Sequence, residues 1–165
     1  MGVSQRVLAA AVAAVVAGGA LTAASPAGAT TPRSPHGAES AGTTRAVVTD
    51  IGEVVNQLSG EYTGLGKGET GSEGFDVAPN GRWTGSMWVP WVGNDGEIGK
   101  SIVVYRGIRA QYWLFQDYWD TADQIRYSTT KSYQQSVPVP GSSTGGGRKR
   151  LIVRGDGSLF LEKIN

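Results

Sequence analysis

The sequence predicts an all-β domain, a small antiparallel barrel or sandwich of eight or nine short strands with one short N-terminal helix. Runs of Val, Ile, Tyr, Trp and Thr recur through the second half of the chain, and these residue types favour strands. Gly, Asn and Asp separate the runs at short intervals, which is typical of antiparallel neighbours joined by tight turns. The pattern therefore predicts the all-β class.

The N-terminal residues 1–29 predict a cleaved secretory signal peptide. A positive start containing Arg6 precedes the apolar run Val7–Ala17, and Ala27 and Ala29 supply the small residues of a cleavage site. The apolar run is shorter than the about 20 residues that cross a bilayer. The chain has no cysteine that could carry a lipid. We expect a secreted, extracellular protein with no membrane association after cleavage.

Two further segments follow the signal. Residues 30–45 are rich in Thr, Pro, Ser, Gly and Ala and have no hydrophobic period, which predicts a disordered linker or pro-segment. Residues 46–165 are long enough for a single β domain with one core. Because the domain has no disulfide, packing must stabilise it.

The first element of the domain is expected to be the short helix. Asp50 and Glu53 have the spacing of a capping box, and Gly60 could end the helix. Apolar residues recur at helical spacing between these positions: Ile51, Val54, Val55 and Leu58.

Three turns define the strands that follow. Asn80-Gly81 predicts a hairpin between 75–77 and 83–92, and Gly107 separates two strands at 101–106 and 108–119. Asp156-Gly157 predicts a hairpin that joins 151–154 to 159–164. The segment Pro138–Gly147 is expected to be a surface loop.

The short helix is followed by Leu58-Ser-Gly-Glu-Tyr-Thr-Gly64 and then by a strand meander. This order resembles the calycins, the family of lipocalin and avidin-type barrels. The resemblance implies a calycin-like barrel. The glycines of 61–68 fit a curved strand in the barrel wall.

The residue types restrict the chemistry. The single histidine, His36, lies in the expected linker, and the chain has no cysteine. Ser-His-Asp and Cys-His catalysis and ordinary zinc sites are therefore excluded from the domain. We expect no cofactor and no metal. Basic and acidic residues are balanced, so a nucleic-acid partner is not expected.

Charge is unevenly distributed along the chain. Residues 50–97 contain eight acids and two bases, whereas residues 98–165 contain ten bases and five acids. We expect the two halves to pair with each other in the fold, the alternative being a dipolar surface that steers a charged partner. The run Arg148-Lys149-Arg150 is expected to be a solvated strand start, the alternative being a site for an anionic polymer.

Aromatic residues give the strongest indication of function. Counting alternate positions along one strand places Trp113, Asp117 and Trp119 on one face together with Arg109. An aromatic face beside polar groups suits a sugar ring, although the same residues could form ordinary core. The candidate ligand-binding residues are Trp88, Trp91, Arg109, Trp113, Asp117 and Trp119.

These observations favour a secreted non-enzymatic protein that binds carbohydrate or a cell-wall polymer, or an apolar small molecule. One alternative is a carboxylate-dependent polysaccharide hydrolase that pairs Asp117 with Glu97 or Asp120. Another is a secreted inhibitor or toxin that binds a protein partner through an exposed loop such as Pro138–Gly147. Such small β proteins more often bind than cleave, and no catalytic motif is present.

Cleavage of the signal is open to direct test. The mature protein is expected in the culture medium with Thr30 at its N-terminus, because cleavage follows Ala27-Gly28-Ala29. Edman sequencing and the intact mass of the secreted protein measure this. A cell-associated product that keeps Met1 would contradict it.

Overall fold

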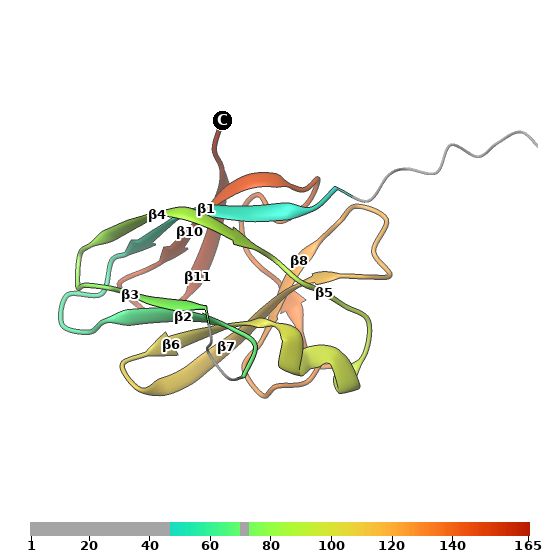
Figure 1. Ribbon diagram of the computed structural model, residues 1–165, viewed down its shortest axis with the longest axis horizontal. Coiled ribbons are helices and arrows are strands. Elements are labelled where there is room, and N and C mark those ends of the chain that lie inside the picture. The colour runs from blue at the N-terminus through green and yellow to red at the C-terminus, as the bar shows by residue number, and fades with distance from the viewer. Residues whose placement is uncertain (1–46, 70–72) are drawn as a thin grey trace, which may run out of the picture. The chain divides into compact units, whose positions relative to one another are not determined.

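A computed structural model describes residues 47–69 and 73–165, so the expected signal peptide and linker lie outside the described residues. The described part contains eleven strands and one 3₁₀ helix (Figure 1). The all-β class is confirmed. The elements are β1 (Thr49–Asn56), β2 (Thr63–Lys67), β3 (Gly74–Val77), β4 (Arg82–Trp88), β5 (Trp91–Val92), η1 (Asp95–Lys100), β6 (Ile102–Arg106), β7 (Arg109–Asp117), β8 (Ile125–Ser128), β9 (Val137–Pro138), β10 (Gly147–Val153) and β11 (Leu159–Lys163).

The strands form two sheets. The first has the order β11-β10-β1-β4, and the second has the order β3-β2-β6-β7-β8-β9, with β5 paired to β7 beyond the end of β6. Each order ends in strands with one neighbour, so the described strands do not close a barrel. Two pairs, β1 with β10 and β5 with β7, are parallel. The expectation of antiparallel neighbours is therefore wrong for these two pairs.

One hydrophobic core fills the space between the sheets. Ile51, Leu151 and Leu161 contribute to it from the first sheet, and Leu65 and Leu114 from the second. All five side chains are almost completely removed from water. In a domain without disulfides, this burial supplies the main favourable free energy of folding.

The expected helix at 50–60 is wrong, because residues 49–56 form the central strand β1. The strand pairing is irregular between Ile51 and Glu53, where Gly52 has no partner in β4 or β10. This bulge adds one residue to the alternation, so Ile51 and Val54 both point into the core at a spacing of three. The spacing of apolar residues in a bulged strand can therefore resemble the spacing in an amphipathic helix.

The turns are placed correctly, but one has a different role. Gly107 and Gly157 lie in hairpins as expected, with φ of 57° and 86°. The turn at Asn80-Gly81 instead connects β3 of the second sheet to β4 of the first. Its positive φ is at Asn80, and Gly81 donates to the carbonyl of Ala78 at 2.9 Å.

Most residues of Pro138–Gly147 are exposed, as expected of a surface loop, but the segment is held to the core. Val139 and Ser143 are buried within it. Backbone hydrogen bonds join Val139 and Ser143 to Ile125, and join Pro140 to Leu161. A segment held in this way covers the core rather than projecting from the surface.

The amide of Gln116 in β7 is fully buried and joins the two sheets. Its Oε1 accepts from the backbone of Thr49 at 3.1 Å, and its Nε2 donates to the carbonyl of Val47 at 2.8 Å. A second bond from Nε2 reaches the carbonyl of Asp123 at 3.3 Å. One side chain thereby replaces a strand-to-strand contact between β7 and the start of β1.

Asn56 has the corresponding role at the other end of β1. Its Nδ2 donates to the carbonyls of Glu61, Val77 and Ala78 at 2.8 to 3.1 Å, and its Oδ1 accepts from the backbone of Leu58 at 3.0 Å. The side chain is fully buried. It ties the end of β1 to the loop before β2 and to the end of β3 in the second sheet.

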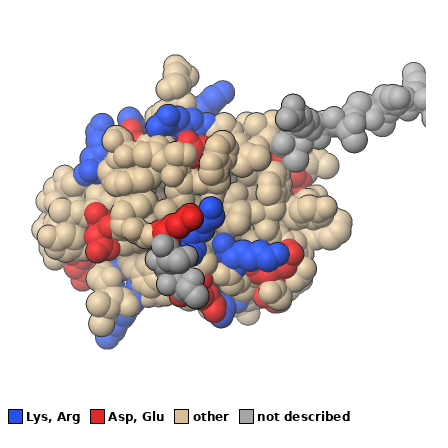
Figure 2. Space-filling view, viewed as in Figure 1, with Lys and Arg blue, Asp and Glu red and all other residues tan. Residues whose placement is uncertain are grey.

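The acidic and basic halves of the chain meet in the fold, as expected. Ion pairs join Glu53 to Arg150, Glu61 to Arg106, and Glu69 to Lys131. Charges of both signs are interspersed on the face shown in Figure 2. The described surface therefore carries mixed charge there rather than one acidic and one basic pole.

The basic run does not form one surface. Lys149 points inward, is buried, and donates to the carbonyl of Thr144 at 2.8 Å. Arg150 is paired with Glu53 and Glu162 at 2.8 Å each. Arg148 lies across the bulge and donates to the carbonyl of Gly85 at 2.9 Å. All three side chains are used within the fold.

Replacing Asn56 with Ala should lower the free energy of unfolding by about 3 kcal/mol, because one buried and two partly buried carbonyls lose a donor together. Urea denaturation measures the change. Gln57→Ala is the matched control, because this neighbouring side chain is exposed. Equal stability of the two variants would show that the amide of Asn56 contributes nothing.

Candidate functional site

Three aromatic side chains gather where β7 ends and the chain turns. Tyr118 is 62% exposed and Trp119 is 71% exposed. Their rings meet edge to face at 5.0 Å between centroids, and Trp91 of β5 meets Tyr118 edge to face at 6.5 Å. We call Trp91, Tyr118 and Trp119 the aromatic platform.

The indole of Trp119 is held in one orientation although it is exposed. Its backbone N–H donates to Oδ1 of Asp117 at 3.0 Å, and its Nε1 donates to the carbonyl of Gly93 at 2.9 Å. A Cβ atom at position 93 would lie 2.9 Å from Nε1, so the indole needs glycine there. The bond from Nε1 restrains the indole, whereas the bond from the backbone N–H restrains the main chain at the turn.

The carboxylate of Asp117 lies next to the platform and accepts the hydrogen bond from the backbone of Trp119. The residue is only 8% exposed, and Oδ1 also accepts from the hydroxyl of Tyr133 at 2.8 Å. Its other oxygen lies 3.7 Å from Nε of Arg126. The ring of Tyr133 packs on the buried ring of Phe115 at 5.7 Å. The carboxylate is thus occupied by protein donors.

Burial raises the pKa of Tyr133 to about 12, and the hydrogen bond to the Asp117 carboxylate adds to this effect. The hydroxyl therefore keeps its proton through the physiological range. It remains a donor to Asp117, which in turn accepts from Trp119.

Three of the six candidate residues come together in this site. Trp91 and Trp119 belong to the platform, and Asp117 lies beneath it. Trp113 is half-buried on the same face of β7 and packs against the small apolar cluster that contains Phe115. Trp113 therefore packs beneath the site and is not part of its exposed aromatic surface.

Trp88 lies elsewhere. It is 54% exposed on β4 of the first sheet. It lines an open groove with Trp83 and Phe75, whose rings stack at 3.8 Å. Trp91 follows three residues later but belongs to the other sheet. Closeness in sequence therefore did not mean a shared surface.

Arg109 is also separate from the platform. It is exposed at the start of β7, at the hairpin with β6, where it pairs with Arg106. The pairing is irregular between Val104 and Tyr105, and Gln111 has no partner. Alternation counted from Trp113 back to Arg109 fails at this irregularity.

Sequence reasoning missed Tyr118, Tyr133 and Gly93. Alternation along a continuous strand would place Tyr118 on the opposite face from Trp119, but β7 ends at Asp117 and both rings follow the turn. Asp117 bonds the backbone N–H two residues later, which is the pattern of an Asx turn. An aspartate two residues before Trp119 was therefore an available signal that the strand ends.

The described acidic residues near the platform do not form a metal-binding cluster. Within 47–69 and 73–165, no three His, Cys, Asp or Glu side chains gather closely enough to hold an ion. The pKa of Glu97 is lowered, first by its hydrogen bond from Lys100 and then by one from the backbone of Gly93. A general acid requires the opposite shift.

Comparison with protein-family models, curated proteins and solved structures finds no match to this chain. In the described part of the chain, no helix has the length and apolar character needed to span a membrane.

The raised pKa of Tyr133, which donates to Asp117 next to the platform, predicts that the folded protein loses stability at alkaline pH. In the unfolded chain Tyr133 ionises near its ordinary pKa of 10.0, whereas in the fold the value is about 12. Between these values the unfolded state binds fewer protons, so the free energy of unfolding should fall as pH rises from about 10 to about 12 and be unaffected below.

Ultraviolet absorbance of tyrosinate follows the ionisation directly. Tyr133→Phe should remove a late-ionising phase from the folded protein, and the phase should be absent from wild-type protein in concentrated urea. A folded wild-type protein whose tyrosines all ionise like those of the urea-unfolded chain would refute this.

Proposed function

We propose that this chain is a secreted non-enzymatic binding protein whose aromatic platform takes a carbohydrate or a cell-wall polymer. The supporting observation is that Trp119 is 71% exposed and yet its indole donates a hydrogen bond from Nε1 to the carbonyl of Gly93, while its backbone is held by Asp117. A protein exposes a large aromatic ring at the cost of leaving apolar area in water. An exposed aromatic ring with a restrained orientation is typical of a ligand-binding surface.

The geometry fits a sugar ring in two ways. The apolar face of a pyranose stacks on an indole, and Tyr118 beside it adds a second ring and a hydroxyl. Because the indole is already ordered, binding loses little side-chain entropy. Asp117 acts here as a positioning residue, since its Oδ1 already holds Trp119 and Tyr133.

The alternatives are supported less well. A hydrolase that uses Asp117 with Glu97 needs a carboxyl that stays protonated, but the pKa of Glu97 is lowered. An inhibitor that uses Pro138–Gly147 needs a projecting loop, but backbone hydrogen bonds hold this segment to Ile125 and Leu161.

Pull-down on insoluble glycans and purified cell walls tests the proposal. Trp119→Ala should weaken retention by about tenfold or more, because one stacked ring is worth on the order of 1.4 kcal/mol. Trp88→Ala is the matched control, since it removes an equally large exposed indole from the first sheet. Gly93→Ala keeps all three rings but displaces Nε1 of Trp119, and it should also weaken retention.

Retention should be similar at low and high salt, because aromatic stacking is not screened. Melting curves establish that each variant folds. If Trp119→Ala binds as well as wild type, or Trp88→Ala loses as much affinity, the platform is not the binding surface.

A further inference from the structure

The rings of the aromatic platform form a corner and not a flat surface. Tyr118 stands nearly perpendicular to both Trp91 and Trp119, with interplanar angles of 89° and 87°. A flat sugar ring can stack on only one of two perpendicular aromatic faces, so the other ring lies at the edge of the bound sugar. The substituents at this edge then face the polar groups around the platform, and these groups determine which glycans bind.

A carboxylate lies beside the indole of Trp119. The N–H of Gly93 donates to Oε2 of Glu97 at 3.0 Å, and the carbonyl of Gly93 accepts from Nε1 of Trp119 at 2.9 Å. A Cβ atom at position 93 would lie 2.9 Å from that Nε1 and 3.6 Å from that Oε2, so both groups flank a single glycine. The pKa of Glu97 is lowered, first by its hydrogen bond from Lys100, which keeps the carboxylate ionised at neutral pH.

A second carboxylate, that of Asp120, directly follows Trp119 in sequence. Its Oδ1 accepts from the backbone N–H of Ala122 at 2.7 Å, whereas its Oδ2 has no hydrogen bond or ion pair within the described part of the chain. After burial and the hydrogen bond to Asp117, the charge of Asp120 also contributes to the raised pKa of Tyr133. The carboxylate therefore lies close to the groups that hold Trp119, and one of its oxygens can accept from a ligand.

The two cations near the platform are already paired. Lys100 donates to Oε1 of Glu97 at 2.9 Å, and Nε of Arg126 lies 3.7 Å from Oδ2 of Asp117. These two ion pairs cancel, so the unpaired carboxylate of Asp120 leaves a net negative charge around the rings. A glycan that carries carboxylates or phosphates would therefore be repelled, whereas a positively charged glycan would be attracted.

The hydrogen-bonding capacity around the rings favours the same ligand class. Carboxylates accept hydrogen bonds and cannot donate them, and the indole N–H of Trp119 is already used by Gly93. A protonated amine supplies three donors and a positive charge, and it is also attracted to an aromatic face. An N-acetylated nitrogen keeps a single N–H, carries no charge and adds a carbonyl acceptor. A free amine therefore matches this site better than its acetylated counterpart.

We propose that the aromatic platform selects glycans of amino sugars whose nitrogen is a free amine. This inference rests on the proposed glycan-binding function and names the ligand class of the same site. The sugar ring stacks on Trp119, its ammonium group donates to Asp120, and the charge of Glu97 adds to the attraction. Neutral glycans bind by stacking alone, and anionic glycans bind most weakly.

Isothermal titration calorimetry with soluble oligomers of equal length tests the proposal at mildly acidic pH, where the amine is protonated. The glucosamine oligomer should bind about tenfold more tightly than the N-acetylglucosamine oligomer at low salt, because an exposed ion pair and a cation–π contact add to stacking. This ratio should fall toward one at high salt, while binding of the acetylated oligomer stays constant. A galacturonic acid oligomer should bind more weakly than either.

Two matched variants locate the charge. Asp120→Asn keeps the side-chain shape and an Oδ1 acceptor for Ala122, and it should lower the ratio about threefold while the affinity for the acetylated oligomer is unchanged. Asp76→Asn makes the same charge change on β3, three strands from β7 in the second sheet, and should keep the wild-type ratio. Trp119→Ala should lose affinity for both oligomers, since both stack on the indole.

The outcomes separate this inference from the function on which it rests. Equal affinity for the two oligomers, with both lost in Trp119→Ala, would overturn the amine preference and leave glycan binding standing. An equal fall of the ratio in Asp76→Asn and Asp120→Asn would assign the preference to the overall charge and overturn the proposed contact. Binding of none of the oligomers would contradict both the function and its ligand class.

Discussion

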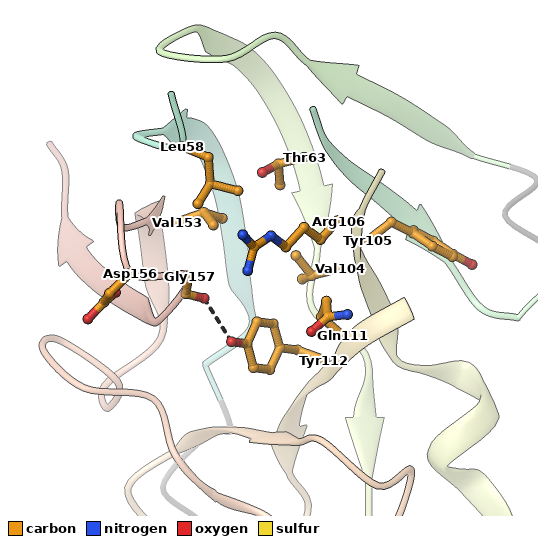
Figure 3. Close-up of a pocket in the computed structure, with 10 residues that line it drawn as sticks. All are labelled: Leu58, Thr63, Val104, Tyr105, Arg106, Gln111, Tyr112, Val153, Asp156 and Gly157. Carbon is orange, nitrogen blue, oxygen red and sulfur yellow. Dashed lines mark hydrogen bonds between the residues drawn. The ribbon is translucent and has the colours of Figure 1, made fainter. Parts of the chain in front are cut away.

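The side-chain amides of Gln116 and Asn56 hold the two ends of β1 to the second sheet through buried hydrogen bonds. The domain has no disulfide, so these amides and the shared core replace covalent links between the sheets. Gln116 also lies between Phe115 and Asp117 in β7, so its bonds fix the end of the strand that the platform residues Tyr118 and Trp119 follow. Asn56 orders Leu58, which lines a small cavity between the sheets near the start of β7 (Figure 3). Removing either amide would therefore disturb the packing between the sheets at one end of β1.

Charged residues add to this framework from the outer face of the first sheet. Glu53 is buried to 8% side-chain exposure and pairs with Arg82 of β4 and Arg150 of β10 at 2.8 Å each. The carboxylate thereby links three adjacent strands. Arg148 lies over Gly52 and covers the bulge, where a Cβ atom would collide with its guanidinium. The basic residues thus stabilise an irregular strand.

The sequence predicted those parts of the structure that depend on local chemistry. Gly107 and Asp156-Gly157 gave two hairpins correctly because a tight turn with positive φ depends on adjacent residues. The helix at 50–60 was wrong because a bulge at Gly52 alters the alternation, and bulges depend on partner strands. Tertiary pairing also decided the site. Trp91 joins Trp119 because β5 pairs with the end of β7, whereas Trp88 is directed to the other sheet, and nothing in the local pattern separates them.

β7 runs from the cavity between the sheets, which Gln111 and Tyr112 line, to the platform, whose Tyr118 and Trp119 follow its last residue, which raises the question whether the two places influence each other. They are about 20 Å apart along β7, beyond the distance at which separate changes usually interact. Coupling would require an element with two alternative arrangements whose balance both places influence. β7 is paired with β6 on one side and β8 on the other, and the amide of Gln116 fixes it to β1. A strand held on both edges has no second register available without loss of the core. Changes in packing at the cavity should therefore leave the platform as it is, a preformed surface for its ligand.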